Sequence, residues 1–443
     1  MTLVEAAAHI SERADGMVLK VFQFNFEQWK IHLADYPEQE EAQRTLDGII
    51  YGEKLGYKGP RFDRKARNPE YTGPQRRHLK RETQQRSESG ELIGGFEKSP
   101  TSYVMTSPYF TVPKGEHGFR SIHNLSHPLG SSINDGILMD EFEVKLNSTS
   151  DVMNGIRELV DRMKPGDRIM ACKADFLNAY RQVCIAPTDY PIAALIFDGK
   201  IYYETRLPFG GRSSPGIFCR ISNQFKWIVQ KKHGVEFLFG FYDDFLGLGF
   251  EKGPKNIFHI DAAITAVSKI LNFQTKEEKH VPPTTIITFL GIEYDLEVLC
   301  ARIPLSKVEE TLEKVRKALA GASITVRKTM SLLGSLVFVC CIVLPGRSFV
   351  SRIIARLRML GPLPDKKAKI FIDHGFRADL QWFERFLPSY NGLSIILEKE
   401  WSNILVEVDA SGWGAGGFCG KEWFSHKWEG DFVSLDIVVV CVQ

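Results

Sequence analysis

The sequence lacks the features that mark secreted, membrane-spanning and zinc-bound proteins. Its eight cysteines include no CxxC pair and no ligand-like spacing with histidine, which argues against a zinc site or a disulfide framework and fits a reducing compartment. The opening MTLVEAAAHISERADG lacks the basic start and apolar core of a signal peptide. The most apolar stretch, SLLGSLVFVCCIVLPG, is shorter than the roughly 18 residues of a membrane span, so we expect a core helix there. These absences predict an intracellular protein with no membrane partner; nucleus and cytoplasm both stay open.

A strong charge excess is also missing, and so is any internal repeat. The chain of 443 residues has a formal net charge of +2, with 44% hydrophobic and 25% charged residues, which is ordinary for a soluble globular protein. At about 150 residues per domain, this length predicts two to four folded parts. A balanced total says little about partners, because it can hide basic patches.

Changes in pattern divide the chain into five expected parts. Residues 1–60 read as amphipathic helix, and residues 61–100 as a basic connector rich in arginine and lysine between Arg61 and Arg81. That connector is either a solvated linker or a nucleic-acid contact. Residues 101–300 mix strands and helices, residues 301–398 are helical, and residues 401–443 begin a new strand with a Gly-rich turn. We also expect Ser306 and Glu309 to form a capping box at a helix start.

Two adjacent carboxylates, Asp243 and Asp244, stand inside the apolar run FLFGFYDDFLGLGF. Burying unpaired carboxylates is costly, and two neighbours also repel each other. An exposed turn is the usual explanation of such a pair. Apolar strands on both sides instead favour a β-hairpin that projects the two side chains into one cleft.

A third carboxylate, Asp175, ends another apolar strand in IMACKADFLNAY. Carboxylate oxygens gathered in a cleft are the ligands that Mg²⁺ prefers, with Mn²⁺ as a substitute. Two such ions can stabilise the attacking and leaving oxygens of a phosphoryl transfer. The pattern predicts two-metal polymerase chemistry.

Six motifs in order, between Tyr103 and Lys307, resemble the reverse transcriptases of retroelements. They are TVPKGEHGFRSIHNLSHPLGSSIND, KADFLNAYRQV, LPFGGRSSPGIF, FYDDF, FQTKEEKHVPP and FLGIEYD. The flanking WKIHLADYPEQEEAQRTLDGIIYGEKLGYKGP, GELIGGF, SLLGSL and LPGRSF are similar to polyproteins of tyrosine-recombinase (DIRS-like) retrotransposons. The resemblance implies an α+β right-hand polymerase fold, with fingers and an antiparallel palm sheet in 101–300 and a helical thumb or connection in 301–398.

The same resemblance assigns the metal site. Asp175, Asp243 and Asp244 match the family's metal carboxylates, with Asp244 more supporting than ligating, and the backbone carbonyl of Phe176 is an additional ligand. Lys279 matches a lysine that protonates the leaving pyrophosphate, although a solvated lysine is nearly as good an interpretation. The hairpin departs from the family in carrying Phe241 where tyrosine is common.

Six residues match the family's nucleotide site, and one of them is Phe176, named above for its backbone carbonyl. Lys114 and Arg120 correspond to cations that hold the incoming triphosphate, and Tyr180 to the aromatic gate that excludes a ribose 2′-OH. Phe209 and Gly210 in LPFGG correspond to residues packed at the templating pair. Without the motifs, the cations would read as exposed surface residues and Tyr180 as a core tyrosine.

The tail VEVDASGWGAGGF resembles the first strand of a retroelement RNase H, which implies a truncated, RNase H-like α/β segment at 401–443. Asp409 matches its first metal carboxylate, and Asp436 stands where the family has glutamate. Because the given sequence stops before the remaining ligands, we expect no RNase H activity. A turn residue is an equally good interpretation of Asp409.

The leading prediction is an RNA-directed DNA polymerase, a nucleotidyltransferase acting on dNTPs with an RNA or DNA template and a primer. Other parts of a retroelement polyprotein are further expected partners, and the oligomeric state is open. Two alternatives stay open: an RNA-dependent RNA polymerase, which Tyr180 disfavours, and a decayed or domesticated nucleic-acid-binding remnant without catalysis.

Overall fold

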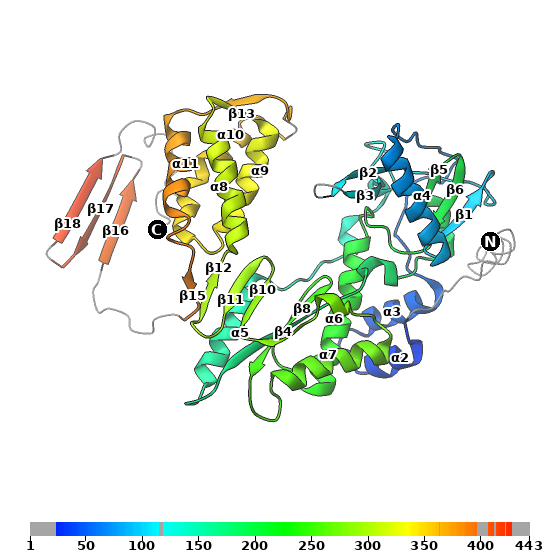
Figure 1. Cartoon of the computed structure of the whole chain (residues 1–443), viewed down its shortest axis with the longest axis horizontal. Helices are drawn as coiled ribbons and strands as arrows, with labels where there is room; N and C mark the ends of the chain where they lie inside the picture. Colours follow the sequence, from blue (N-terminus) through cyan, green and yellow to red (C-terminus); the bar gives the residue numbers. More distant parts are fainter. Residues whose placement is uncertain are drawn as a thin grey trace. The chain divides into compact units, whose positions relative to one another are not determined.

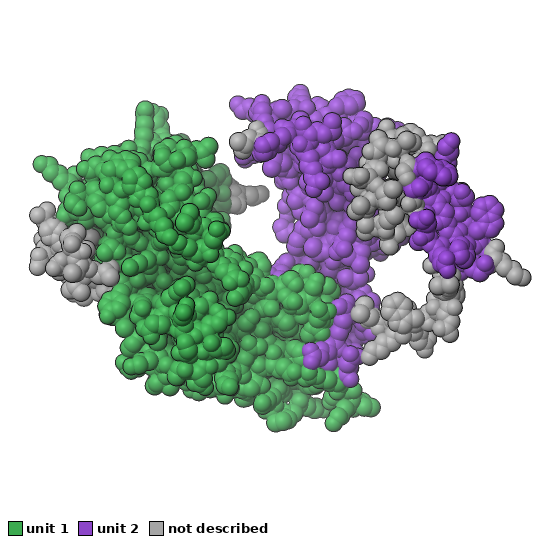
Figure 2. Space-filling view, turned by 180° about the vertical axis from the view of Figure 1, so that it is seen from behind, with its two compact units in different colours: residues 1–155, 162–284 green, residues 156–161, 285–443 purple. Residues whose placement is uncertain are grey.

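The computed structural model describes residues 24–114, 118–362, 364–396, 406–411, 413–420 and 422–427. The chain divides into two compact units, coloured separately in Figure 2: residues 1–155 with 162–284, and residues 156–161 with 285–443. Figure 1 labels the helices and strands. The five-part division expected from the sequence stays a prediction.

The first unit opens with two helices, α2 (Phe26–Leu33) and α3 (Gln39–Tyr51). Asn25 caps α2 by accepting a hydrogen bond from the Gln28 amide. Trp29 is completely buried, and its indole nitrogen donates to the Leu271 carbonyl at 3.2 Å. This contact fixes α2 to the main core. Of the helical region expected over residues 1–60, helix is present at α2 and α3, and residues 1–23 lie outside the described residues.

One small sheet has the strand order β1–β6–β5, and a separate hairpin is formed by β2 and β3. The elements of this region are α4 (Gly73–Glu88), β1 (Leu92–Phe96), β2 (Tyr109–Lys114), β3 (Gly118–His123), β5 (Ala194–Phe197) and β6 (Lys200–Glu204). Leu79 of α4 is completely buried against Leu92, Tyr109 and Leu195. The basic helix α4 is thus packed on this region by its one apolar face.

The central sheet has the order β7–β8–β4–β9, and all of its pairs are antiparallel. Its strands are β4 (Ile169–Asp175), β7 (Leu238–Phe241), β8 (Asp244–Phe250) and β9 (Val281–Thr284), and the helices beside it are α5 (Thr149–Arg162), α6 (Ser214–His233) and α7 (Ile257–Leu271). Gly247 lets α7 approach closely, since a Cβ there would lie 2.6 Å from Ile260. Helix α7 therefore packs directly on the sheet face.

Short 3-10 helices connect these elements. In the first unit they are η1 (Asn134–Gly136), η2 (Met139–Glu141), η3 (Ala179–Gln182), η4 (Pro187–Ile192) and η5 (Glu277–Lys279), and η6 (Leu344–Phe349) lies in the second.

An aromatic cluster surrounds Phe176, the residue that follows β4. Phe176 stacks on Phe273 with ring centres 3.7 Å apart and meets Phe218, Phe225 and Phe245 edge-on. The cluster fixes the backbone that follows β4.

Among its described residues, the second unit combines helices with three small sheets. Its helices are α8 (Leu305–Leu319), α9 (Val326–Val339), α10 (Ser351–Arg358) and α11 (His374–Phe386). Its strands are β10 (Ile286–Phe289), β11 (Ile292–Asp295), β12 (Cys300–Arg302), β13 (Ser323–Thr325), β14 (Lys369–Phe371), β15 (Leu393–Ser394), β16 (Val406–Ser411), β17 (Gly414–Cys419) and β18 (Glu422–Lys427). The core helix expected in the most apolar stretch is present only from Ser331 to Val339, as the second half of α9, and the α-helix ends before Cys340. In the described ranges no helix is long and apolar enough to cross a membrane.

The expected capping box at Ser306 is wrong. Helix α8 begins earlier, at Leu305, with Pro304 as its N-cap and no side-chain cap. The Pro304 carbonyl accepts from the amides of Lys307 and Val308 at 2.8 and 3.1 Å. Proline fixes its own φ near the helical value, so the helix starts there and Ser306 already lies in the first turn.

Candidate active site

The structure brings the three predicted carboxylates to one place in the central sheet. Asp175, the last residue of β4, lies directly opposite Asp244, the first residue of β8. The Phe176 amide donates to the Asp243 carbonyl oxygen at 2.9 Å. Two stretches far apart in the sequence are therefore joined by backbone pairing at the end of the two strands.

Asp243 lies in the tight turn of the β7–β8 hairpin. Phe241 pairs with Asp244, which leaves Tyr242 and Asp243 as a two-residue loop. Tyr242 has a φ of 52°, in the left-handed region that residues other than glycine seldom adopt. The hairpin predicted from FYDDF is confirmed, and its turn places Asp243 beyond the end of the strand that carries Asp244.

Two lysines neutralise part of this acidic cluster. Lys279 Nζ lies 2.8 Å from Asp175 Oδ2, and Lys173 Nζ lies 3.2 Å from Asp244 Oδ1. The Asp175 side chain is 5% exposed, so its carboxylate meets little water. The bond to Asp175 raises the pKa of Lys279, since the nearby carboxylates favour the ammonium form.

The positive charge of the two lysines does not fully compensate the cluster. Burial, together with a hydrogen bond to the Asp175 carboxyl, raises the pKa of Asp244 to about 6. Burial and the charge of Asp175 also raise the pKa of Asp243. Raised values in adjacent acids mean that the ionised cluster would be stabilised by additional cations.

The side chains of the cluster are of a kind that binds divalent cations, although they do not now lie close enough together to coordinate one. Within the described ranges, no three His, Cys, Asp or Glu side chains are close enough together to hold a metal ion as they stand. The donors available are carboxylate oxygens, which suit Mg²⁺. Because Lys279 occupies Asp175, an arriving cation would have to displace that ammonium group.

The rings of Tyr180 and Phe209 pack against each other, tilted by 32°. Their ring centres are 5.2 Å apart, and Tyr180 also contacts Phe218 at 5.4 Å. Burial and the proximity of Tyr242 and Asp243 raise the pKa of Tyr180 to about 12. Phe209 is 64% exposed, which is unusual for a large aromatic side chain.

Phe176 and Gly210 are placed by their backbones. Phe176 is 2% exposed, with its ring in the aromatic cluster, and its backbone amide is bonded to the Asp243 carbonyl. Its role as a metal ligand stays a prediction. A Cβ on Gly210 would lie 2.6 Å from the His123 carbonyl oxygen, a distance that real Cβ atoms essentially never show. The Gly210 carbonyl accepts from Asn134 Nδ2 at 2.8 Å.

The two predicted triphosphate-binding cations lie on the β2–β3 hairpin. Lys114 is the last residue of β2, Arg120 pairs with Val112, and both side chains are exposed. In the described part of the chain, neither contacts the three carboxylates. The structure does not bring them to that cluster.

Of the two acids in the tail, one can be placed. Asp409 lies in β16 opposite Gly416 of β17, and its side chain is exposed. Asp436 lies outside the described residues. The RNase H resemblance and the metal roles of both residues stay predictions.

Sequence reasoning missed two residues next to the cluster. Lys173 precedes Asp175 by two positions in a strand, so the alternation of side chains would have placed both on one face. Asn147 gave no comparable signal. The Asn147 backbone amide donates to the Gly240 carbonyl at 3.1 Å, and the Asn147 side-chain Oδ1 accepts from the Gly240 backbone amide at 2.9 Å.

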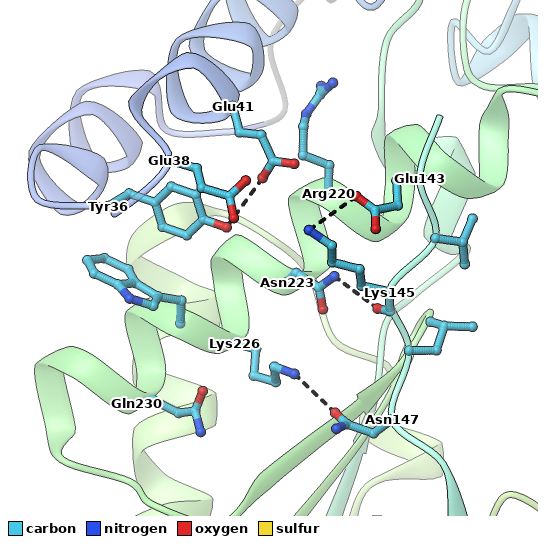
Figure 3. A pocket seen from close by; sticks show the side chains of 13 residues that line it. Tyr36, Glu38, Glu41, Glu143, Lys145, Asn147, Arg220, Asn223, Lys226 and Gln230 are labelled. Carbon is cyan, nitrogen blue, oxygen red and sulfur yellow. Dashed lines mark hydrogen bonds and ion pairs between the residues drawn. The ribbon is translucent and has the colours of Figure 1, made fainter. Parts of the chain in front are cut away.

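Asn147 also lines a separate cavity of about 530 Å³ (Figure 3). Tyr36 and Trp227 form one wall, with ring centres 5.2 Å apart, and Lys226 reaches from α6 to Asn147 Oδ1 at 3.0 Å. Burial lowers the pKa of Lys226. Asn147 therefore joins this cavity directly to β7, the strand that leads into the acidic turn, through its two hydrogen bonds to Gly240.

Solved structures of a foamy viral protease–reverse transcriptase have a similar fold. The foamy viral protease–reverse transcriptase in complex with double-stranded DNA has 14% sequence identity and a TM-score of 0.54, over 93% of this chain and 82% of that chain. Its dRH form in complex with double-stranded DNA has 16% identity and a TM-score of 0.54, over 93% and 69%. The complex with an RNA/DNA hybrid has 14% identity and a TM-score of 0.56, over 93% and 53%.

These similarities show that the chain has a reverse-transcriptase-like, mixed helix-and-sheet fold. No protein-family model and no curated protein sequence matches the chain. The fold predicted from the sequence is therefore confirmed in its general form. The DIRS-like subfamily stays a prediction.

Proposed function

We propose that the protein is an RNA-directed DNA polymerase that extends a primer with dNTPs. The observation that carries the proposal is the meeting of Asp175 with the Asp243–Asp244 hairpin at one end of the central antiparallel sheet. Three acids on two neighbouring strand ends, within a reverse-transcriptase-like fold, suit phosphoryl transfer better than any other chemistry.

Asp175 and Asp243 would hold the metal ions, with Asp244 in support. When bound, Mg²⁺ supplies positive charge that stabilises the oxygens on which negative charge develops. The burial of Asp175 restricts water around its carboxylate, which strengthens its attraction for a cation. Lys279 retains its proton because of the neighbouring acids, so it is a charged donor near the place where pyrophosphate would leave.

Tyr180 and Phe209 would form the wall of the nucleotide pocket. The Tyr180 ring lies between the acidic turn and the exposed Phe209 ring, where a bulky ring excludes a ribose 2′-OH. Lys114 and Arg120 would contact the triphosphate from the β2–β3 hairpin. Template and primer would be held mainly through phosphates.

Primer extension on an RNA template with dNTPs and Mg²⁺ tests the proposal. We expect extension by the wild type, and a loss of at least about 10²-fold in Asp175→Asn and Asp243→Asn, since each change removes charge needed in the transition state. Template binding by both variants should persist. Extension unaffected by both substitutions would refute the assignment.

Replacing dNTPs with rNTPs in the same assay tests the sugar preference. An RNA polymerase would extend the primer better with rNTPs. Template binding by the wild type without extension under any of these conditions would instead indicate a non-catalytic nucleic-acid-binding protein.

A further inference from the structure

A fully buried carboxylate, Glu204, ends strand β6 and is surrounded by cations. Its side chain is 0% exposed. Arg86 of α4 donates to Glu204 Oε2, and Arg181 Nη1 donates to the same oxygen at 2.6 Å. His123 Nδ1 of β3 lies 3.3 Å from Glu204 Oε1. One carboxylate therefore connects α4, β3 and η3.

Glu91 completes the cluster. Its Oε2 lies 3.3 Å from Arg86 Nε and 3.8 Å from Arg181 Nε, so two guanidinium groups face two carboxylates. Burial alone would raise the pKa of Glu204, but the charges of Arg181 and Arg86 outweigh it and hold that pKa below its usual value. The cluster is thus ionised, and each guanidinium is fixed by more than one contact.

The two arginines differ in what else they contact. Arg181 immediately follows Tyr180, and its guanidinium carbon lies 5.2 Å from the centre of the Phe209 ring. Phe209 thereby contacts Arg181 as well as Tyr180, although 64% of the residue is exposed. Arg86 binds the same Glu204 oxygen and also Glu91, and the aromatic residue that interacts with it is Tyr109 rather than Phe209.

His123, the third partner of Glu204, lies against Gly210, the residue that follows Phe209. Its carbonyl oxygen is the atom that leaves no room for a Cβ on Gly210. The Phe209–Gly210 backbone and the Phe209 ring are therefore both in contact with residues of the Glu204 cluster. An exposed aromatic ring would otherwise sample several rotamers, at an entropic cost whenever a ligand orders it.

We propose that Arg181 is a positioning residue, which Glu204 holds in place so that its guanidinium fixes the Phe209 ring as one wall of the dNTP pocket. This inference rests on the proposed polymerase function. Arg181 would act on nucleotide binding and on discrimination between deoxyribose and ribose, with little effect on the chemical step. Arg86 would serve only the stability of the cluster.

Substituting lysine for each arginine separates these roles. Arg181→Lys keeps the charge that Glu204 requires but loses the flat surface over Phe209. In single-turnover primer extension, we expect the dNTP Kd to rise about 2- to 5-fold, as for an exposed cation–π contact, with a nearly unchanged maximal rate. Discrimination against rNTPs should fall as well. In Arg86→Lys we expect a lower melting temperature and an unchanged dNTP Kd.

A double-mutant cycle tests whether Arg181 acts through the ring. If it does, Arg181→Lys should have no further effect on the dNTP Kd in a Phe209→Leu background. Equal Kd changes in Arg181→Lys and Arg86→Lys would overturn the inference, and so would additive effects in the cycle. A wild type that does not extend primers would instead refute the proposed function.

Discussion

The Asp244 carboxyl is held in a position that disfavours its own charge. Burial and the Asp175 carboxyl raise its pKa from 3.8 to about 6, and only Lys173 opposes the shift with an ion pair. The folded chain thus binds this proton more tightly than the unfolded chain. The free energy of unfolding should accordingly fall as the pH rises from about 4 to 6, and the destabilisation is complete above 6.

Asp244→Asn should remove this destabilisation. Without divalent cations at pH 7.5, we expect stabilisation by about 1 kcal/mol, or about 2 to 4 °C in melting temperature, after allowance for solvent screening. The difference should disappear near pH 4, where the wild-type carboxyl is protonated. Thermal unfolding in EDTA at both pH values measures the difference in stability between the variant and the wild type. Asp140→Asn, at an exposed position of η2, is the control. A variant no more stable than the wild type at pH 7.5 would contradict the prediction.

Gly210 has no space for a side chain. In Gly210→Ala the new Cβ would meet the His123 carbonyl oxygen, which belongs to the backbone and moves only with its strand. We expect a loss of about 1 to 3 kcal/mol in stability and a higher dNTP Kd. Gly334→Ala in α9 is a matched control, since nothing lies within 4 Å of its Cβ and alanine favours helix. Equal stability of the two variants would show that the loop accommodates the methyl group.

Strand β7 is fixed by a side chain from outside the sheet. Asn147 makes two hydrogen bonds to Gly240, and Lys226 donates to the same Asn147 oxygen. Gly240 begins the turn sequence that ends in Asp243. Besides its pairing with β8, β7 is therefore held by one residue of the preceding loop.

Asn147→Ala should loosen the hairpin without unfolding it. Because the Gly240 amide loses its acceptor, we expect faster hydrogen exchange at Gly240 and about a 10-fold lower rate of primer extension. Asn223→Ala is the matched control: Asn223 lines the same cavity but donates to the Lys145 carbonyl instead. Unchanged exchange at Gly240 would show that the other contacts of β7 are sufficient.

The elements that carry the acids were predictable, because β4 is an apolar strand that ends at Asp175 and β8 is an apolar strand that begins at Asp244. The strand pattern suggested Asp175 as the third carboxylate and the motifs supported it, but the pairing of β4 with β8 was not predictable, since no local pattern specifies which strands pair. Glu204, Arg86 and Arg181 are ordinary charged residues in the sequence. Only the fold brings them together, so no spacing rule could have found them. The start of α8 was missed because Pro304 overrides a capping pattern two residues later.

Over the whole molecule, a net charge of only +2 conceals an uneven distribution. Helix α4 packs through Leu79 and presents its opposite side to solvent, where Arg77 and Arg81 are exposed one turn apart. Such a row of cations is suited to the phosphates of a nucleic acid. We therefore expect template–primer binding to weaken steeply with salt.

Removing two of these charges should change that dependence. In Arg77→Gln/Arg81→Gln, the slope of log K against log salt concentration should become shallower by about 2, since each phosphate contact contributes about 1. Fluorescence anisotropy with a labelled RNA/DNA duplex at several salt concentrations measures the slope. Lys58→Gln is the control, because Lys58 already pairs with Glu141. Identical slopes in all three proteins would place the nucleic acid elsewhere.

Because Lys279 is paired with Asp175, the chemical reactivity of Lys279 reports whether a cation has bound to the acidic cluster. An amine held as ammonium by neighbouring acids is a poor nucleophile, and Lys279 is 54% exposed, so reagents can reach it. A divalent cation that displaced it would lower its pKa and quicken its acylation. Mass-spectrometric labelling of this one lysine would then measure how often the acids are occupied, before any nucleotide is added.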